Sequence, residues 1–158
     1  MARNEIVIEA GPHEVFEVLA DPWAYSSWVT GTAEIRGADS DWPRPGAALH
    51  HSVGAGPLRL RDDARVLEAE PPAMLRLLAR ARPLPSATVT LHLQGEGDAT
   101  RVVMIEHPTS RIASLLLGPL GHAMLAVRNH ESLRRLKALA ESRAGSRRRA
   151  GAKRGAGA

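Results

Sequence analysis

The chain begins with an alternating pattern that predicts a β-strand. In residues 3–10, Ile6 and Ile8 fall on one face of an extended chain while Glu5 and Glu9 fall on the other. Gly11-Pro12 ends the alternation, and from Pro12 the apolar residues recur at helical spacing as far as Ala20. Asp21-Pro22 stops this helix and can cap a second short helix, which we expect over residues 22–28.

From about residue 32 the pattern changes to short strands separated by turn residues. The predicted strands cover 32–38, 47–53, 58–69, 73–82, 86–94 and 100–107. The breaks between them are rich in glycine and proline, as in an antiparallel meander. Residues 109–142 are then predicted to form a long helix that Gly118-Pro119 interrupts, since proline removes a backbone donor. Only this helix is long enough to cover the apolar face of the sheet.

The distribution of charge divides the chain into a domain and a tail. The 158 residues carry a formal charge of +4, but residues 143–158 carry +6 with no acidic residue, which leaves residues 1–142 at −2. We expect one domain over 1–142, and a basic disordered tail over 143–158 because that segment lacks apolar periodicity. With no cysteine, no signal-peptide pattern and no apolar run of membrane-spanning length, the sequence indicates a cytoplasmic protein without stable membrane insertion.

Several motifs resemble those of one large superfamily. The stretch from Gly11 to Pro22, followed by Tyr25 and Trp28, resembles its N-terminal signature, and further likenesses lie at 66–72, 97–102 and 133–137. The chain is similar over residues 3–142 to the SRPBCC superfamily, which includes START domains, polyketide cyclases or dehydrases and bacterial lipid-transport-like proteins. The resemblance implies an α+β helix-grip fold. In that fold a curved seven-stranded antiparallel sheet wraps the long C-terminal helix, two short helices lie between strands 1 and 2, and a cavity for a hydrophobic ligand is left inside.

Two strands place polar side chains on faces that are otherwise apolar. In 58–69, Leu60 and Asp62 share a face with apolar neighbours, and in 47–53, Leu49 and His51 do the same. All four are predicted to point inward, and the turn at 54–57 would bring His51 and Asp62 close across a hairpin. They are therefore candidates for ligand binding, and His51 with Asp62 for acid–base catalysis. A paired histidine without a catalytic role is the alternative interpretation.

The long helix carries two apolar stripes. A rotation of 100° per residue aligns one that we expect to face the sheet: His122, Leu125, Asn129, Leu133, Leu136 and Ala140. Leu125 would line the cavity, and the polar members His122 and Asn129 would either orient a ligand there or form a helix-to-sheet hydrogen bond. Trp28, which matches the family position, would line the cavity or serve as a packing anchor. The second stripe contains Leu116, Leu117, Leu120, Met124 and Val127. It would gate the cavity or form a dimer contact, so the chain is a monomer or a homodimer.

The first hypothesis for function is binding or transport of a lipid-like or aromatic small molecule without catalysis. One alternative is a polyketide cyclase, aromatase or dehydratase that uses His51 and Asp62, with His122 as a further acid or base. Another is an interaction or toxin-like protein that acts through the second stripe or the tail. The seven histidines show no metal-ligand spacing and no cofactor motif is present, so we expect neither metal nor cofactor. Nucleic acid would bind only through the basic tail.

Overall fold

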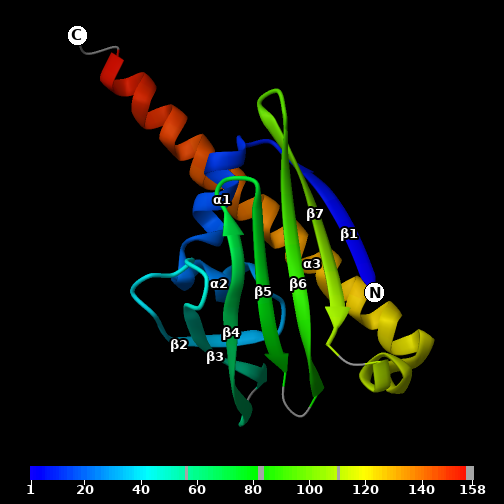
Figure 1. The fold of residues 1–158 in the computed structure, drawn as a ribbon. Coiled ribbons are helices and arrows are strands. Elements are labelled where there is room, and N and C mark those ends of the chain that lie inside the picture. The colour runs from blue at the N-terminus through cyan, green and yellow to red at the C-terminus, as the bar shows by residue number, and fades with distance from the viewer. Residues whose placement is uncertain (56, 82–83, 110, 156–158) are drawn as a thin grey trace.

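A computed structural model describes residues 1–158 apart from 56, 82–83, 110 and 156–158, and apart from the side chains of 55, 81, 84–85, 111–117 and 155. The elements follow one another in this order: β1 (Ala2–Ile8), α1 (Pro12–Leu19), the 3₁₀ turn η1 (Pro22–Ala24), α2 (Tyr25–Trp28), β2 (Thr32–Ala38), β3 (Ala48–Ala55), β4 (Leu58–Glu70), β5 (Met74–Ala81), β6 (Leu84–Glu96), β7 (Ala99–Pro108) and α3 (Arg111–Gly155). The described residues therefore form the predicted helix-grip fold (Figure 1).

The sheet is antiparallel throughout, with the strand order β1-β7-β6-β5-β4-β3-β2. Strands β2 to β7 form a meander, whereas β1 crosses to the far side and pairs with β7, for example Ile6 with Val102. Two successive strands of the chain, β1 and β2, thus form opposite edges of the sheet. Helices α1 and α2 connect these edges, which positions α2 beside β2 (Figure 1).

The short helices begin where the sequence supplies caps. Gly11 precedes α1, its N–H donates to Glu14 Oε2 at 2.8 Å, and Pro12 occupies the first helical position. Asp21 Oδ1 accepts from the N–H of Trp23 at 3.0 Å and so caps η1. The predicted second helix is therefore a 3₁₀ turn followed by one turn of α-helix.

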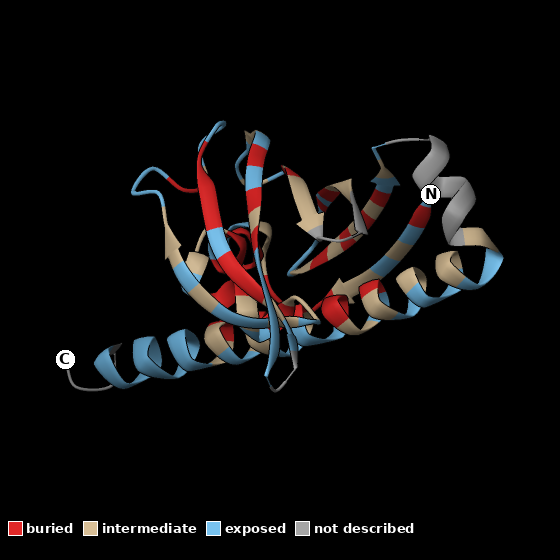
Figure 2. Cartoon of the chain, turned by 90° about the horizontal axis from the view of Figure 1, so that it is seen from below, coloured by how far each residue is buried: buried red, intermediate tan, exposed pale blue. Residues whose placement is uncertain are grey.

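Helix α3 lies across the sheet and supplies much of the core. Gly118 has φ 56° and ψ −175°, which breaks the helix at the predicted kink before Pro119. Beyond the kink, Leu133, Leu136 and Ala140 are fully buried, as expected for the stripe that faces the sheet. Figure 2 shows buried positions concentrated on the inner face of the strands and the middle of α3, while the C-terminal end of α3 is exposed.

The structure corrects the prediction of a disordered tail over residues 143–155, whereas 156–158 lie outside the described residues. Helix α3 continues to Gly155, past the expected boundary at 142. Ala144 is buried, and three arginines of this segment contact acidic residues. The ion pairs are Arg143–Asp21, Arg147–Glu17 and Arg148–Glu14. The sequence shows the positive charges of this segment, but it does not show that acidic residues of α1 and the following turn lie beside them.

A second correction concerns the start of β4. Leu60 was expected to point inward, but it is 48% exposed, and Leu58 on the same face of the strand is 82% exposed. Alternation does hold further along the strand, where Asp62, Ala64 and Val66 are buried. Among the described residues, helix α3 packs mainly on β1, α1, α2 and β7, and β3 and β4 are not among its main contacts. A face that alternation makes inward-pointing is therefore exposed at the end of the strand.

Candidate functional site

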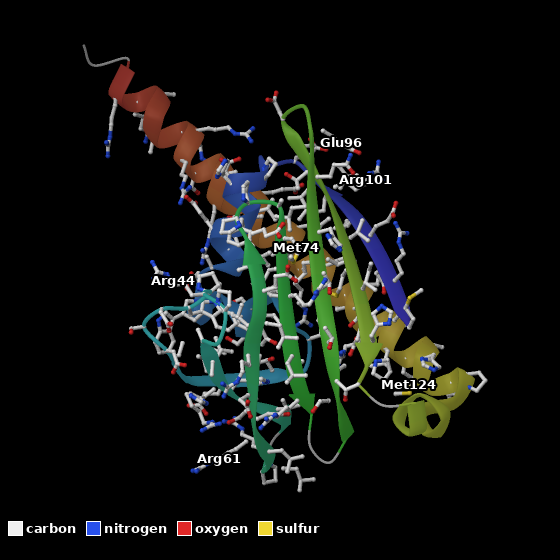
Figure 3. The ribbon with its side chains drawn as sticks, in the orientation of Figure 1. Arg44, Arg61, Met74, Glu96, Arg101 and Met124 are labelled. Atoms are coloured by element: carbon white, nitrogen blue, oxygen red, sulfur yellow. The ribbon has the colours of Figure 1, made fainter. Side chains whose placement is uncertain are left out.

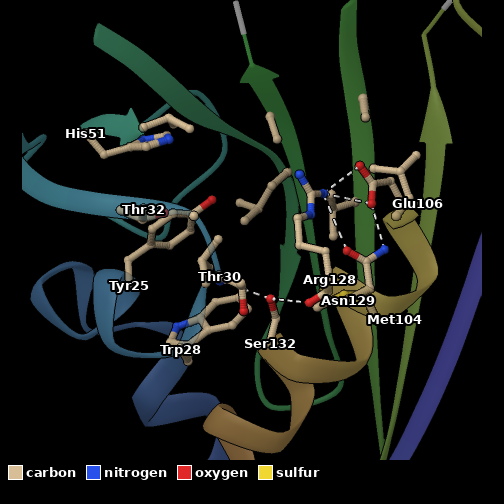
Figure 4. A pocket seen from close by; sticks show the side chains of 18 of the residues that line it. Tyr25, Trp28, Thr30, Thr32, His51, Met104, Glu106, Arg128, Asn129 and Ser132 are labelled. Atoms are coloured by element: carbon tan, nitrogen blue, oxygen red, sulfur yellow. Dashed lines mark hydrogen bonds and ion pairs between the residues drawn. The ribbon is translucent and has the colours of Figure 1, made fainter. Parts of the chain in front are cut away.

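A pocket of about 120 Å³ lies between the sheet, α2 with its following loop, and α3 (Figure 4). Five strands and two helices line it. The lining residues are Tyr25, Trp28, Val29, Thr30, Gly31, Thr32, His51, Val53, Leu77, Ala79, Arg80, Ala87, Val89, Met104, Glu106, Pro108, Leu125, Arg128, Asn129 and Ser132. Most of these side chains are apolar, and the polar ones gather into two clusters.

The first cluster joins α2 to β3. The rings of Tyr25 and His51 have centroids 5.4 Å apart, and those of Tyr25 and Trp28 are also 5.4 Å apart in an edge-to-face arrangement. All three side chains are buried. The single turn of α2 places Tyr25 and Trp28 three positions apart on one face of the helix, so both reach the pocket.

His51 and Asp62 are partners in the β3–β4 register, as the hairpin argument predicted. Burial lowers the pKa of His51, and the nearby Asp62 carboxylate opposes this shift. The Arg36 guanidinium donates to the backbone oxygens of both His51 and Asp62. The imidazole is therefore held as a neutral ring at the wall of the pocket, beside a buried acid.

The second cluster is built around Glu106, whose side chain is only 4% exposed. Arg128 Nη2 donates to both Glu106 oxygens at 3.0 Å, and Asn129 Nδ2 donates to Oε2 at 2.6 Å. Glu106 comes from β7 and its two partners from α3, so the cluster ties the helix to the sheet across the pocket wall. Each charge in it is compensated by a direct partner.

Helix α3 is also connected to the loop that follows α2. Ser132 Oγ donates to the Arg128 carbonyl at 3.0 Å and accepts from the Thr30 N–H at 3.0 Å. This pair of bonds fixes the 29–31 loop against α3 and closes one side of the pocket (Figure 4).

Among the residues that the structure describes, three buried polar atoms of the pocket lining have no hydrogen-bond partner: Trp28 Nε1, Thr30 Oγ1 and His51 Nδ1. Buried polar groups are nearly always paired in native proteins, because an unpaired one costs about 1–3 kcal/mol. Their concentration around one pocket indicates a place where a bound molecule could supply partners.

The structure brings together only part of the predicted site. Trp28, His51, Leu125 and Asn129 line the pocket. Leu49 is fully buried in the core instead, and Asp62 is buried opposite His51; neither is among the lining residues. Leu60 is exposed, as described above, and His122 is half-buried on α3 away from the lining. Whether the four lining residues contact a ligand stays a prediction.

Sequence reasoning missed the centre of the second cluster. Glu106 shares the inner face of β7 with Val102 and Met104, so the alternation argument applied to Asp62 would have found it. Arg128 and Ser132 neighbour Asn129 on α3, but nothing in the sequence shows that Arg128 meets Glu106 or that Ser132 meets the 29–31 loop.

The second apolar stripe is exposed where the structure describes it. Leu120, Met124 and Val127 are 76%, 67% and 71% exposed, and Leu116 and Leu117 lie outside the described side chains. Met124 projects from the end of α3 opposite the C-terminal segment (Figure 3). Among the described residues, no three His, Asp or Glu side chains are grouped to hold a metal ion, and none of the helices there has the length and hydropathy to cross a membrane.

Comparisons with known proteins agree with the fold. A family model described as polyketide cyclase / dehydrase and lipid transport matches residues 2–141. A crystal structure of a protein from Chromobacterium violaceum is similar at 22% identity, with 88% of this chain and 96% of that chain covered and a TM-score of 0.66. A solution structure of an Arthrobacter aurescens protein has 16% identity, 89% and 85% coverage and a TM-score of 0.70.

A third similar structure is DynU16, a protein in the dynemicin biosynthetic locus. It has 21% identity, covers 87% of this chain and 45% of its own, and has a TM-score of 0.64. No curated protein matches the chain.

Proposed function

Because the chain belongs to the polyketide cyclase / dehydrase and lipid transport family, we propose that it binds a small hydrophobic molecule in the pocket between the sheet and α3. The observation that carries the proposal is the composition of the pocket wall, which is mostly apolar but includes buried polar atoms without partners. Ligand sites commonly combine an apolar lining with a few polar groups that fix orientation.

The volume limits the size of the ligand. Ligand sites for drug-sized molecules measure about 300–1,000 Å³, whereas an apolar cavity of about 150 Å³ accepts benzene. A pocket of about 120 Å³ suits a molecule of about one ring, such as a small aromatic compound. A long acyl chain would require the walls to separate.

A large side chain introduced on α3, which would fill the pocket, tests this proposal. Leu125 lines the pocket, whereas Val127, two residues along the same helix, is 71% exposed. We expect Leu125→Trp to abolish the binding of ethylbenzene, measured by isothermal titration calorimetry, because the indole would occupy the ligand volume. Val127→Trp adds the same group outside and should bind like wild type. Equal binding by wild type and Leu125→Trp, or no binding by wild type, would contradict the proposal. Native mass spectrometry of protein from its own host would look for a retained ligand.

A second candidate function is an enzyme of the cyclase, aromatase or dehydratase type. The position of His51 at the pocket wall, opposite Asp62 and beside the Tyr25 ring, favours it. A neutral imidazole there could remove a proton next to a ligand carbonyl. The test is exchange of the methyl protons of acetophenone in D₂O, followed by NMR. An enzyme would accelerate the exchange and lose the effect in His51→Gln; the same rate with and without protein would count against catalysis.

A further inference from the structure

The hydroxyl of Tyr25 lies between the two polar clusters of the pocket. Figure 4 shows it pointing from α2 into the space between His51 and Arg128. The charges of Arg128, Asp62 and Glu106 all act on it, which places the phenol within electrostatic reach of both clusters. Tyr25 makes no hydrogen bond to another residue in the described part of the chain. Within the described residues, the pocket is therefore lined by a hydroxyl that has no protein hydrogen-bond partner.

This hydroxyl is available as a hydrogen-bond donor. Burial raises the pKa of Tyr25 above its usual range, so the phenol keeps its proton at every physiological pH. A protonated phenol donates one hydrogen bond to an acceptor such as a carbonyl oxygen. Burial also favours the neutral form of the neighbouring His51, so neither of these two rings carries a charge.

The charged residues that line the pocket are already paired. Arg128 binds both oxygens of Glu106, and Arg80 lies 3.4 Å from Asp63 Oδ1. An anionic ligand would have to compete with a carboxylate for either arginine and would meet the Glu106 charge directly. A cationic ligand would likewise have to displace Arg128 from Glu106. The pocket thus offers compensation for neither sign of charge.

We propose that the pocket is selective for a neutral molecule of about one ring that carries an acceptor oxygen, and that Tyr25 is the specificity-determining residue, donating a hydrogen bond to that oxygen. The inference rests on the proposed function and narrows it to a chemical class: small aryl ketones, esters and similar neutral acceptors. Fatty acids and other carboxylates are excluded from this class.

Three probes of nearly the same shape test the proposal on the full chain by isothermal titration calorimetry. Ethylbenzene has no acceptor, acetophenone has a neutral carbonyl, and benzoate has a charged carboxylate. We expect acetophenone to bind about five- to tenfold more tightly than ethylbenzene, the effect of one hydrogen bond. We expect benzoate to bind the most weakly of the three.

Tyr25→Phe removes the hydroxyl but keeps the ring that contacts His51 and Trp28. It should bring the acetophenone affinity down to that of ethylbenzene and leave ethylbenzene binding unchanged. Tighter binding of benzoate than of acetophenone by wild type would overturn the proposal without any variant. So would an acetophenone preference that persists in Tyr25→Phe. Failure of ethylbenzene and acetophenone alike to bind wild type would instead remove the proposed function itself.

Discussion

The Glu106–Arg128 ion pair makes an asymmetric prediction about stability. Removing either partner deletes the same interaction, but the two side chains differ in exposure: 4% for Glu106 and 39% for Arg128. We compare Glu106→Leu with Arg128→Leu by urea unfolding at pH 7. The cost of each substitution depends on what it leaves behind in the protein.

Glu106→Leu leaves Asn129 Nδ2 without its acceptor, and it leaves Arg128 Nη2 only its 3.4 Å contact with Asn129 Oδ1. Water can solvate the exposed guanidinium, so the Coulombic term for Arg128 contributes little. The buried Asn129 amide loses its 2.6 Å acceptor, which costs about 1–3 kcal/mol. Arg128→Leu instead leaves a buried carboxylate with Asn129 as its one remaining donor in the cluster, and an uncompensated buried charge costs about 3–5 kcal/mol.

We therefore expect Arg128→Leu to lower the free energy of unfolding by about 2 kcal/mol more than Glu106→Leu does. Arg135→Leu is a matched control on the same helix, because its ion pair with Glu131 is exposed, and it should unfold close to wild type. If Glu106→Leu proves as damaging as Arg128→Leu, or more so, the reasoning from exposure is wrong.

Three further predictions concern other parts of the molecule. Burial lowers the pKa of His51, so the unfolded chain takes up a proton more readily than the folded protein does. The unfolding free energy should therefore fall as the pH drops below about 6.5. His51→Gln should flatten that fall, whereas the control His50→Gln, at an exposed residue, should not. Thr100→Val leaves the Ala10 carbonyl without its 2.7 Å donor and should cost about 1–3 kcal/mol in urea unfolding, whereas an unchanged midpoint would show that this bond contributes nothing. Deleting 146–158 removes the ion pairs that the largely exposed Arg147 and Arg148 make, and it should leave the thermal midpoint near wild type. A large loss by calorimetry would assign that segment to the core.

Most of the fold could be predicted from the sequence because its signals are local. The turns at 54–57 and 95–98, the Gly118-Pro119 break and the Asp21-Pro22 boundary each act on a few adjacent residues. Hydrophobic periodicity then assigns each segment to a strand or a helix. The order of strands β2 to β7 follows because consecutive antiparallel strands are usually neighbours. The place of β1 beside β7 does not follow from any local turn.

The site was predicted only where a local rule reaches it. His51 and Asp62 were placed opposite each other because one turn fixes the register of β3 and β4. The pairing of Glu106 with Arg128 depends on how α3 lies over β7, which no local pattern specifies. The inward assignment of Leu60 was wrong for a related reason. Alternation predicts which face of a strand a side chain shares, but it does not predict how far the helix covers that face.

The pairing of β1 with β7 has a consequence for the order in which the protein is assembled. The ribosome makes β1 first, yet Ile6 finds its neighbour Val102 only after the whole meander has been synthesised. Contacts between such distant segments carry a large loop-closure entropy and slow the search for the native state. We expect the meander to form early, with the N-terminal strand joining among the last elements, so that nascent chains expose the β7 edge until then.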